Sequence, residues 1–536
     1  MRASKSVGRA ALLAAILAGA SPPLAAEPAA PADDKTIAKQ FAAAIDSSSA
    51  LDAQSPDTLN SRLAYANFLT KLESGDCRAH LDEAQFQLDL LKASPTLGLV
   101  LADGAARVAQ LEYQLHWARA SCGAGAVVRD QELHAALASA QRAVDLYRDA
   151  FDAVSMVTMQ FNVGVTYHSL GDSGDADAAL QTSIDMDREY GFADDAADNY
   201  RLRLQWSNED SGPEQVAARM KDFPERTATL SFGWFESDAK VTLQSDVSQL
   251  AGAAVAHIRE LRSAHRQVRR RSEDWRVTYQ LDPPHFETEL PTDELLESHF
   301  AISLAQMLTN FHDFSLTREG DFGESRSNFK FEWGARSDAK VLARDFRSRG
   351  LDSRGGHSLR LAHLVVAALQ NALAGENIET QIAERYNLAA GTWIGATLEQ
   401  GVWYDITAAL SLPIAADTYV THQIQFTYSR PVPCTPDSAE VSCIEIVLHA
   451  APDPGILRET LDRLAAMANL PASQLKLWSV TNMRLVTDPK TLQPYSREMR
   501  RHSYWSSGEP GPDHSLIESE RTLLVSGPIT RIERSD

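Results

Sequence analysis

The residues with the most evident chemical potential form a short motif, Gly171-Asp172-Ser173-Gly174. In one class of proteases these residue types surround a serine nucleophile, which also needs a nearby base and an oxyanion hole. Here the motif lies between two stretches of helical periodicity, where Gly and Asp are ordinary turn and capping residues. Asp175 also stands where that protease motif has another glycine. We therefore interpret these residues as a turn between helices.

Two histidines and one glycine pair are further candidates for a metal or anion site, and neither set is strong evidence for catalysis. His357 and His363 are six residues apart, which places them on different faces of a helix, and no acidic third ligand is near them. Gly355-Gly356 could cradle an anion, but neither a lysine nor a second motif accompanies them. The sequence therefore predicts no catalytic residue, cofactor or metal site, and a hydrolase with dispersed catalytic residues stays open as an alternative.

The strongest basic cluster consists of Arg266, Arg269, Arg270 and Arg271. It ends a stretch, Gly252–Arg271, whose composition favours a helix. Cations are stabilised at a helix C-terminus by the helix dipole, so an exposed helix end is the expected structure. The alternative is a contact for an anion, such as an anionic lipid headgroup or an acidic patch on a protein.

The four cysteines are expected to form two disulfides. Cys77 comes just before one predicted helix and Cys122 just after the next, so antiparallel packing would bring the two together. Cys434 and Cys443 flank a Pro-containing connection between two predicted strands and would close a hairpin. A four-cysteine metal site is the alternative, but these spacings do not favour it.

The N-terminus is typical of an exported protein. Basic residues precede an apolar run in Met1–Ala26 that is too short to span a bilayer, which predicts a signal peptide and a periplasmic location. The chain carries a formal charge of -21. Residues 1–26 hold three basic and no acidic residues, so the mature chain would be near -24. A field of that sign argues against nucleic acid as a partner.

After a predicted Ala/Pro-rich leader over residues 27–54, the pattern is helical from residue 55 to residue 223. Helices are expected at 57–74, 79–93, 98–121, 130–151, 154–170, 173–189, 193–207 and 213–222. Small residues alternate with large ones where two of these helices meet: Gly164, Tyr167, Ala176, Leu180 and Ser183.

That arrangement resembles the tetratricopeptide repeat (TPR), a helix–turn–helix unit. The resemblance covers about residues 55–223 and is best around Gln160–Arg188. It implies a solenoid of about four helical pairs whose first helices line a groove for a protein or peptide. A generic helical bundle is the alternative.

Residues 224–536 are expected to form a β-rich α+β domain, so the fold class is α+β with an N-terminal all-α part. Strands are expected at 227–235, 240–250, 275–281, 313–317, 328–333, 392–398, 402–412, 420–428, 443–449, 476–487, 495–505 and 515–525, with helices at 252–271, 293–311, 338–349, 358–373 and 455–469. Residues 392–412 are predicted to form one hairpin. An antiparallel sheet with helices on one face is the main expectation, and a half-barrel around an apolar cavity is the alternative.

These patterns favour a non-catalytic protein that holds a protein or peptide partner in a helical groove. The candidate groove residues, chosen by periodicity, are Gln160, Asn162, Tyr167, Asn199, Arg201 and Arg203. The alternative is a carrier of an apolar or lipid ligand in the β-rich domain.

Overall fold

We describe a computed structural model of the chain. It describes residues 34–49, 56–72, 77–94, 97, 101, 103–123, 125–231, 235–251, 254–271, 274–281, 285–289, 314–319, 328–333, 393, 395–412, 415–435, 437–438, 440–467, 476–506, 514–526 and 529–531. The chain divides into two compact units. The helical unit comprises the chain up to Arg226 together with Gln400–Tyr404, and the sheet unit contains the rest.

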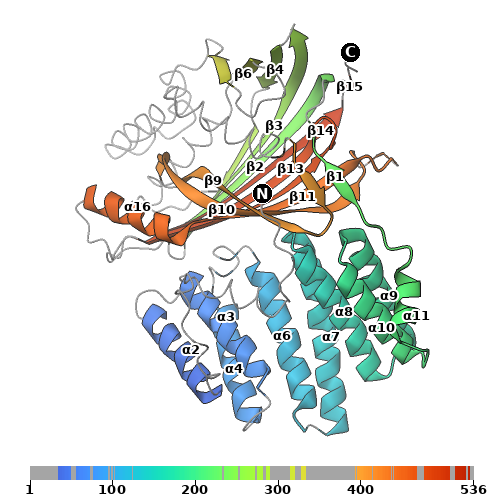
Figure 1. Cartoon of the computed structure of the whole chain (residues 1–536). Helices are drawn as coiled ribbons and strands as arrows, with labels where there is room; N and C mark the ends of the chain where they lie inside the picture. Colours follow the sequence, from blue (N-terminus) through green and yellow to red (C-terminus); the bar gives the residue numbers. More distant parts are fainter. Residues whose placement is uncertain are drawn as a thin grey trace, which may run out of the picture. The chain divides into compact units, whose positions relative to one another are not determined.

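Successive helices of the helical unit pack against one another and lie side by side in a row (Figure 1). The described helices are α2 (Asp34–Ser49), α3 (Pro56–Thr70), α4 (Cys77–Lys92), α6 (Gly104–Ser121), α7 (Ala126–Asp149), α8 (Ala153–Leu170), α9 (Ser173–Tyr190), α10 (Ala193–Trp206) and α11 (Pro213–Met220). From α3 to α11 the helix ends agree with the predicted ones to within six residues, and the largest difference is at the start of α6. The 3.6-residue spacing of apolar positions is a local property that the sequence alone contains.

Helix α2 lies in the stretch that was expected to be a leader. Phe41 packs against Tyr65 and Phe68 of α3, with ring centroids 5.8 Å and 5.6 Å apart. The alanines of residues 34–49 favour a helix. The aromatic side chain of Phe41 then holds this helix against α3.

The helix ends follow the capping residues in the sequence. The carboxylate of Asp152 accepts a hydrogen bond from the backbone N–H of Ser155 at 2.9 Å, which caps the start of α8. Gly171 ends α8 in the left-handed conformation (φ 88°), and α9 begins two residues later. The Gly171–Gly174 motif is therefore the connection between two helices, as predicted.

A turn from far along the sequence completes the helical unit. The backbone N–H of Gln400 donates to the carbonyl oxygen of Arg226 at 2.9 Å, and its side-chain amide donates to the carbonyl oxygen of Glu189. Gly401 (φ 76°) lies so close to Gly191 that a Cβ on it would be 2.9 Å from the Gly191 carbonyl oxygen. This backbone contact requires glycine.

The sheet unit is built on antiparallel strands, most of them in one large sheet (Figure 1). The described strands are β1 (Thr227–Thr229), β2 (Phe235–Ala251), β3 (Ala254–Arg271), β4 (Asp274–Leu281), β5 (His285–Glu289), β6 (Phe314–Glu319), β7 (Asn328–Trp333), β8 (Thr397–Glu399), β9 (Trp403–Leu412), β10 (Ala415–Val432), β11 (Cys443–Pro452), β12 (Lys476–Thr487), β13 (Pro494–Ser506), β14 (His514–Ser526) and β15 (Ile529–Arg531). The order is β7-β6-β4-β3-β2-β14-β13-β12-β11-β10-β9, with β5 beside β3 and β15 beside β2. One long-range pairing, β14 with β2, joins the two runs of neighbouring strands.

Two expectations for this unit were wrong. The stretch predicted as a helix at Gly252–Arg271 is strand β3, which pairs with β2 and β4. Its Ala, Leu, Glu and Arg residues favour a helix locally, but strand pairing on both sides overrides that preference. Residues 392–412 do not form one hairpin either, because β8 pairs with β1 in a separate two-stranded sheet and β9 lies beside β10. The predicted helices at 293–311, 338–349 and 358–373, with His357, His363 and Gly355-Gly356, lie outside the described residues.

The two faces of β10, β11 and β12 differ in polarity. The buried apolar positions of one face are Ile424, Phe426, Tyr428, Ile446, Leu448, Met483 and Leu485. Trp393 packs on Phe426 edge to face at 4.6 Å, and helix α16 (Pro454–Met467) packs on the same face at Val420 and Leu477. On the other face His449 Nδ1 lies 2.7 Å from Asn482 Oδ1. The alternation of strand side chains thus separates a core face from a polar one.

A buried histidine on the apolar face makes the sheet unit sensitive to acid. Burial lowers the pKa of His422 below its usual 6.5, Arg501 lowers it further, and a hydrogen bond from Nδ1 to the Val420 carbonyl opposes the shift. As the pH falls below about 6.5 the unfolded chain binds a proton that the folded chain resists, so stability falls. We expect His422→Asn to lose less stability than the native protein between pH 7.5 and 5.5, measured by urea unfolding. His134→Asn, at an exposed histidine, should behave like the native protein; equal acid sensitivity in all three would contradict the prediction.

Both predicted disulfides are confirmed. Cys77 and Cys122 are joined, with Cα atoms 6.2 Å apart, and so are Cys434 and Cys443 at 5.0 Å. No described helix is long and apolar enough to cross a membrane. Two disulfides fit an exported protein.

Candidate functional site

Helix α8 is the most apolar helix of the unit, and other helices surround much of it. Its eighteen residues contain no Asp, Glu, Lys or Arg. On one side Gly164 allows close approach to α9, because a Cβ there would be 3.2 Å from the backbone nitrogen of Leu180. The side chain of Tyr167 contacts α7, where its hydroxyl accepts a hydrogen bond from Gln141 at 3.3 Å.

Helix α8 also contacts α6 and α10. Thr166, fully buried, hydrogen bonds with Tyr113 of α6, and burial raises the pKa of Tyr113 to about 12, so this phenol stays neutral. His168 stacks on Trp206 of α10, with ring centroids 4.1 Å apart and planes 2° from parallel. Thus α8 has α6 and α10 as neighbours in addition to α7 and α9.

Four of the partly exposed residues of α8 lie in line on one face. They are Val154, Thr158, Phe161 and Val165, which follow the spacing i, i+4, i+7 and i+11. That spacing places four side chains in line on one face of a helix. We call these four residues the α8 stripe. Three of the four are apolar, and the hydroxyl of Thr158 donates to the carbonyl oxygen of Val154 at 2.8 Å. A line of partly exposed, mainly apolar side chains is suited to contact apolar side chains of another molecule.

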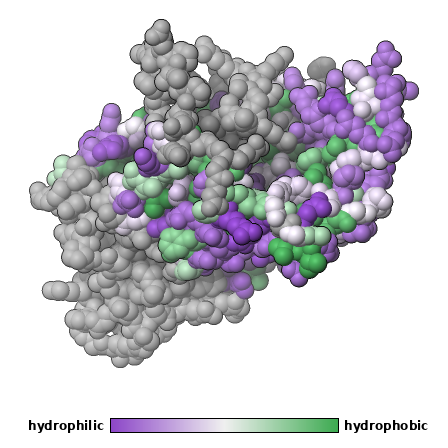
Figure 2. Space-filling model, turned by 90° about the horizontal axis from the view of Figure 1, so that it is seen from below, coloured by the Kyte–Doolittle hydropathy of each residue, from purple (hydrophilic) through white to green (hydrophobic). Residues whose placement is uncertain are grey.

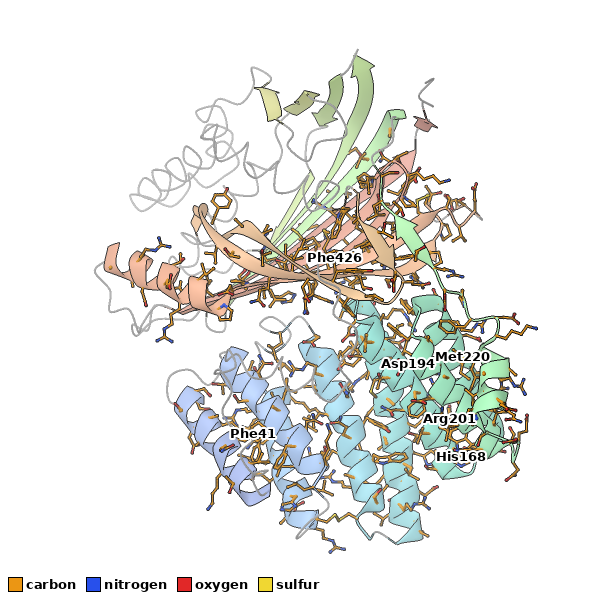
Figure 3. The ribbon with its side chains drawn as sticks, viewed as in Figure 1. Phe41, His168, Asp194, Arg201, Met220 and Phe426 are labelled. Carbon is orange, nitrogen blue, oxygen red and sulfur yellow. A yellow bond between two sulfur atoms is a disulfide. The ribbon has the colours of Figure 1, made fainter. Side chains whose placement is uncertain are left out.

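The aromatic pair His168–Trp206 lies at the C-terminal end of this stripe. His168 is exposed and Trp206 is partly exposed. Figure 3 labels Asp194 near the beginning of α10, Arg201 farther along the same helix, and His168 of α8 at the level of the end of α10. The flat face of a stacked pair adds aromatic surface on which an apolar or cationic group can pack.

The helices that follow α8 carry an excess of acidic residues. Residues 172–225 contain fourteen Asp and Glu but five Lys and Arg. Asp175, Asp185, Asp194 and Asp198 are exposed. In Figure 2 the described side chains on the visible face are mainly hydrophilic, with hydrophobic ones in separate small groups. A cationic partner would therefore be attracted to this end of the helical unit.

Three of the predicted groove residues lie on α8, but not in the stripe. The side-chain amide of Gln160 donates to the carbonyl oxygen of Ala179 in α9 at 3.2 Å, so this residue joins two helices. Tyr167 contacts α7, as described above. Asn162 is partly exposed and follows Phe161 in the sequence, which places it beside the α8 stripe.

The other three lie on α10, and two of them hold α10 to α9. Asn199 is 6% exposed and donates to Asp187 at 2.7 Å and to Ser183 at 3.2 Å, so it is not a surface residue and the expectation for it was wrong. Arg203 forms a bidentate pair with Asp177 at 2.6 Å and 2.9 Å, and this hydrogen bonding lowers the pKa of the Asp177 carboxyl. Arg201 is exposed and pairs with Asp198 on its own helix.

No family model matches this chain, and no curated protein does.

The predicted arginine cluster is divided by the fold. Arg266, Arg269, Arg270 and Arg271 lie on β3, not at the end of a helix. Successive strand positions alternate between the two faces, so Arg266 and Arg270 share one face while Arg269 and Arg271 share the other. In the described parts of the chain, no group of three or more His, Cys, Asp or Glu is arranged to hold a metal ion.

Periodicity did contain the information that would have identified the α8 stripe. Phe161 and Val165 repeat with Val154 and Thr158 at helical spacing, but apolar residues at such positions are usually assigned to the core. Gln160 and Asn199 hydrogen bond to residues of α9. Periodicity within one helix does not reveal such contacts with a neighbouring helix.

Proposed function

We propose that this protein is an exported, non-catalytic scaffold of the cell envelope whose helical unit binds a segment of a protein partner along the α8 stripe. The observation that carries this proposal is the line of partly exposed, mainly apolar residues from Val154 to Val165. The resemblance of residues 55–223 to TPR proteins supports it, because those proteins bind partners on the first helix of each pair.

The charges of the helices near the α8 stripe restrict which partner segments would bind there. The α8 stripe has no charged residue of its own, while the helices that follow are strongly acidic. The partner segment should therefore carry apolar side chains for Phe161 and Val165 and basic residues on at least one side. Apolar contacts would supply most of the affinity, and the acidic helices would raise the association rate at low salt.

A display selection tests this proposal with a defined probe. A random twelve-residue peptide library would be selected on the mature protein, and the strongest peptide measured by fluorescence anisotropy. We expect selected peptides to be rich in Lys, Arg and apolar residues. Phe161→Asp should then weaken binding at least about tenfold, since truncation of a central apolar contact costs about 1–2 kcal/mol or more.

A matched control uses the same substitution on another helix. Phe86 is 55% exposed on α4, so Phe86→Asp should leave the peptide affinity within about twofold. Circular dichroism of both variants should match the native protein, because neither side chain is in the core. Equal binding by the native protein and Phe161→Asp, or loss in both variants, would refute the α8 stripe as the site.

A further inference from the structure

The last turn of α9 holds two later segments of the helical unit in place. Asp187, which is fully buried, accepts a hydrogen bond from Asn199 of α10 at 2.7 Å. The next residue, Arg188, donates to the carbonyl oxygen of Asp222 at 2.7 Å, and its guanidinium lies 5.8 Å from the ring centroid of Phe223. Asp222 and Phe223 both follow α11. The positions of α10 and of the chain after α11 therefore depend on the last turn of α9.

A turn from far along the chain closes this end of α9. The last carbonyl groups of a helix have no partner within the helix itself. The carbonyl oxygen of Glu189 accepts a hydrogen bond from the side-chain amide of Gln400, 211 residues away in the sequence. The backbone N–H of Gln400 donates to the carbonyl oxygen of Arg226 at 2.9 Å, and Gln400 is 7% exposed. We call Gln400 and Gly401 the α9 latch.

Two glycines allow the α9 latch to lie directly against the helix end. Gly191, which ends α9, and Gly401 both have positive φ angles, 80° and 76°. A Cβ on Gly401 would lie 2.9 Å from the carbonyl oxygen of Gly191 and 3.0 Å from that of Tyr190. A Cβ on Gly191 would lie 2.9 Å from the side chain of Gln400. This close fit leaves no room for a side chain on either glycine.

The helices beyond the α9 latch have a small core of their own. The buried residues of α10 are Ala196, Asn199 and Leu204, and that of α11 is Val216, whereas α9 has seven. Segments with few buried apolar contacts open locally at a lower free energy than the whole domain unfolds. The end of the helical unit therefore relies on the contacts that the last turn of α9 supplies.

We propose that the α9 latch is a conformational switch for the C-terminal end of the helical unit. With the latch docked, the last turn of α9 is fixed and holds α10 and α11 in place. With the latch released, the last turn of α9, α10 and α11 open together, while α3 to α8 stay folded. Trp206 of α10 stacks on His168 of α8, so release also separates this aromatic pair. The inference concerns local opening of these helices and does not depend on the peptide binding proposed above.

Amide hydrogen exchange of the full-length protein, followed by mass spectrometry, tests this inference. Gly401→Ala places a methyl group against the carbonyl oxygen of Gly191 and should release the latch. We expect the amides of α10 to exchange at least about tenfold faster than in the native protein, because a strained latch lowers the free energy of local opening. The amides of α6 should stay within about twofold of the native rates. Unchanged exchange in α10, or equal acceleration in α6 and α10, would overturn the inference.

Another glycine provides a matched control. Gly395 has nearly the same φ angle, 78°, but in the described part of the chain a Cβ there would meet no atom within 4 Å beyond its chain neighbours. Gly395→Ala thus introduces the strain of a positive φ without the clash, and α10 should exchange within about twofold of the native rate. Acceleration of α10 as large as that caused by Gly401→Ala would indicate a general loss of stability and would overturn the inference.

A milder variant keeps the test decisive should Gly401→Ala not fold. Gln400→Ala removes the amide donor to Glu189 and leaves the backbone of the latch unchanged. It should accelerate exchange in α10 about threefold, the effect of losing one hydrogen bond, and leave α6 unchanged. Native exchange rates in α10 of Gln400→Ala would contradict the proposed role of the latch.

Discussion

Replacing Leu180 by alanine is expected to lower the free energy of unfolding of the helical unit by about 2–5 kcal/mol. Leu180 is fully buried where α8 and α9 are closest, beside Gly164. Truncation removes apolar contacts and leaves a cavity, and the close backbone approach at Gly164 limits how far the two helices can collapse into it.

The measurement is urea unfolding followed by circular dichroism at 222 nm, where the helices dominate the signal. Leu90→Ala provides the control, because Leu90 is 36% exposed on α4 and should lose less than about 1 kcal/mol. A loss at Leu180 no larger than that at Leu90 would show that the α8–α9 contact is not part of the core.

Removing the Cys77–Cys122 disulfide is expected to have the second large effect. The bridge joins residues 45 apart in sequence, and loop-closure arithmetic for that length gives about 4 kcal/mol of stabilisation. It ties the first residue of α4 to the residue after α6. Cys77→Ser/Cys122→Ser should therefore lower the free energy of unfolding of the helical unit by about that amount.

The second disulfide provides the comparison. Cys434 and Cys443 are nine residues apart, and the same arithmetic gives about 2.6 kcal/mol. Cys434→Ser/Cys443→Ser should lower the stability of the sheet unit, followed by tryptophan fluorescence, by this smaller amount. Reduction of the native protein by dithiothreitol should reproduce both losses. A larger loss from the shorter loop would contradict the loop-length explanation.

Two buried carboxylates, one in each unit, are paired with cations from neighbouring elements. Glu112 on α6 is 7% exposed and forms ion pairs with Lys92 of α4 and with Arg142 of α7. Glu445 on β11 is 3% exposed and pairs with Arg430 and Arg484 at 3.3 Å and 2.8 Å. These carboxylates connect elements of the fold, because a buried charge is stable only when it is paired.

Local patterns in the sequence predicted the positions of most helices of the helical unit and the pairing of its two cysteines. The 3.6-residue spacing predicted α3 to α11 because it needs no knowledge of distant residues. The even cysteine count and the predicted helix ends paired Cys77 with Cys122 correctly. Strand β12 agrees with its prediction at both ends, Lys476 and Thr487, since its alternation is bounded by clear turn residues.

Only the tertiary structure decided which face each residue occupies and which distant strands pair. Strand β3 has helix-forming residues and becomes a strand because β2 and β4 lie on either side of it. The arginines at positions 266, 269, 270 and 271 of this strand are close together in sequence, yet a strand alternates successive residues between its two faces. Asn199 is polar but buried, because Asp187 and Ser183 of the preceding helix, α9, accept its hydrogen bonds. Pairing and burial depend on residues far away in the chain, and local periodicity carries no information about them.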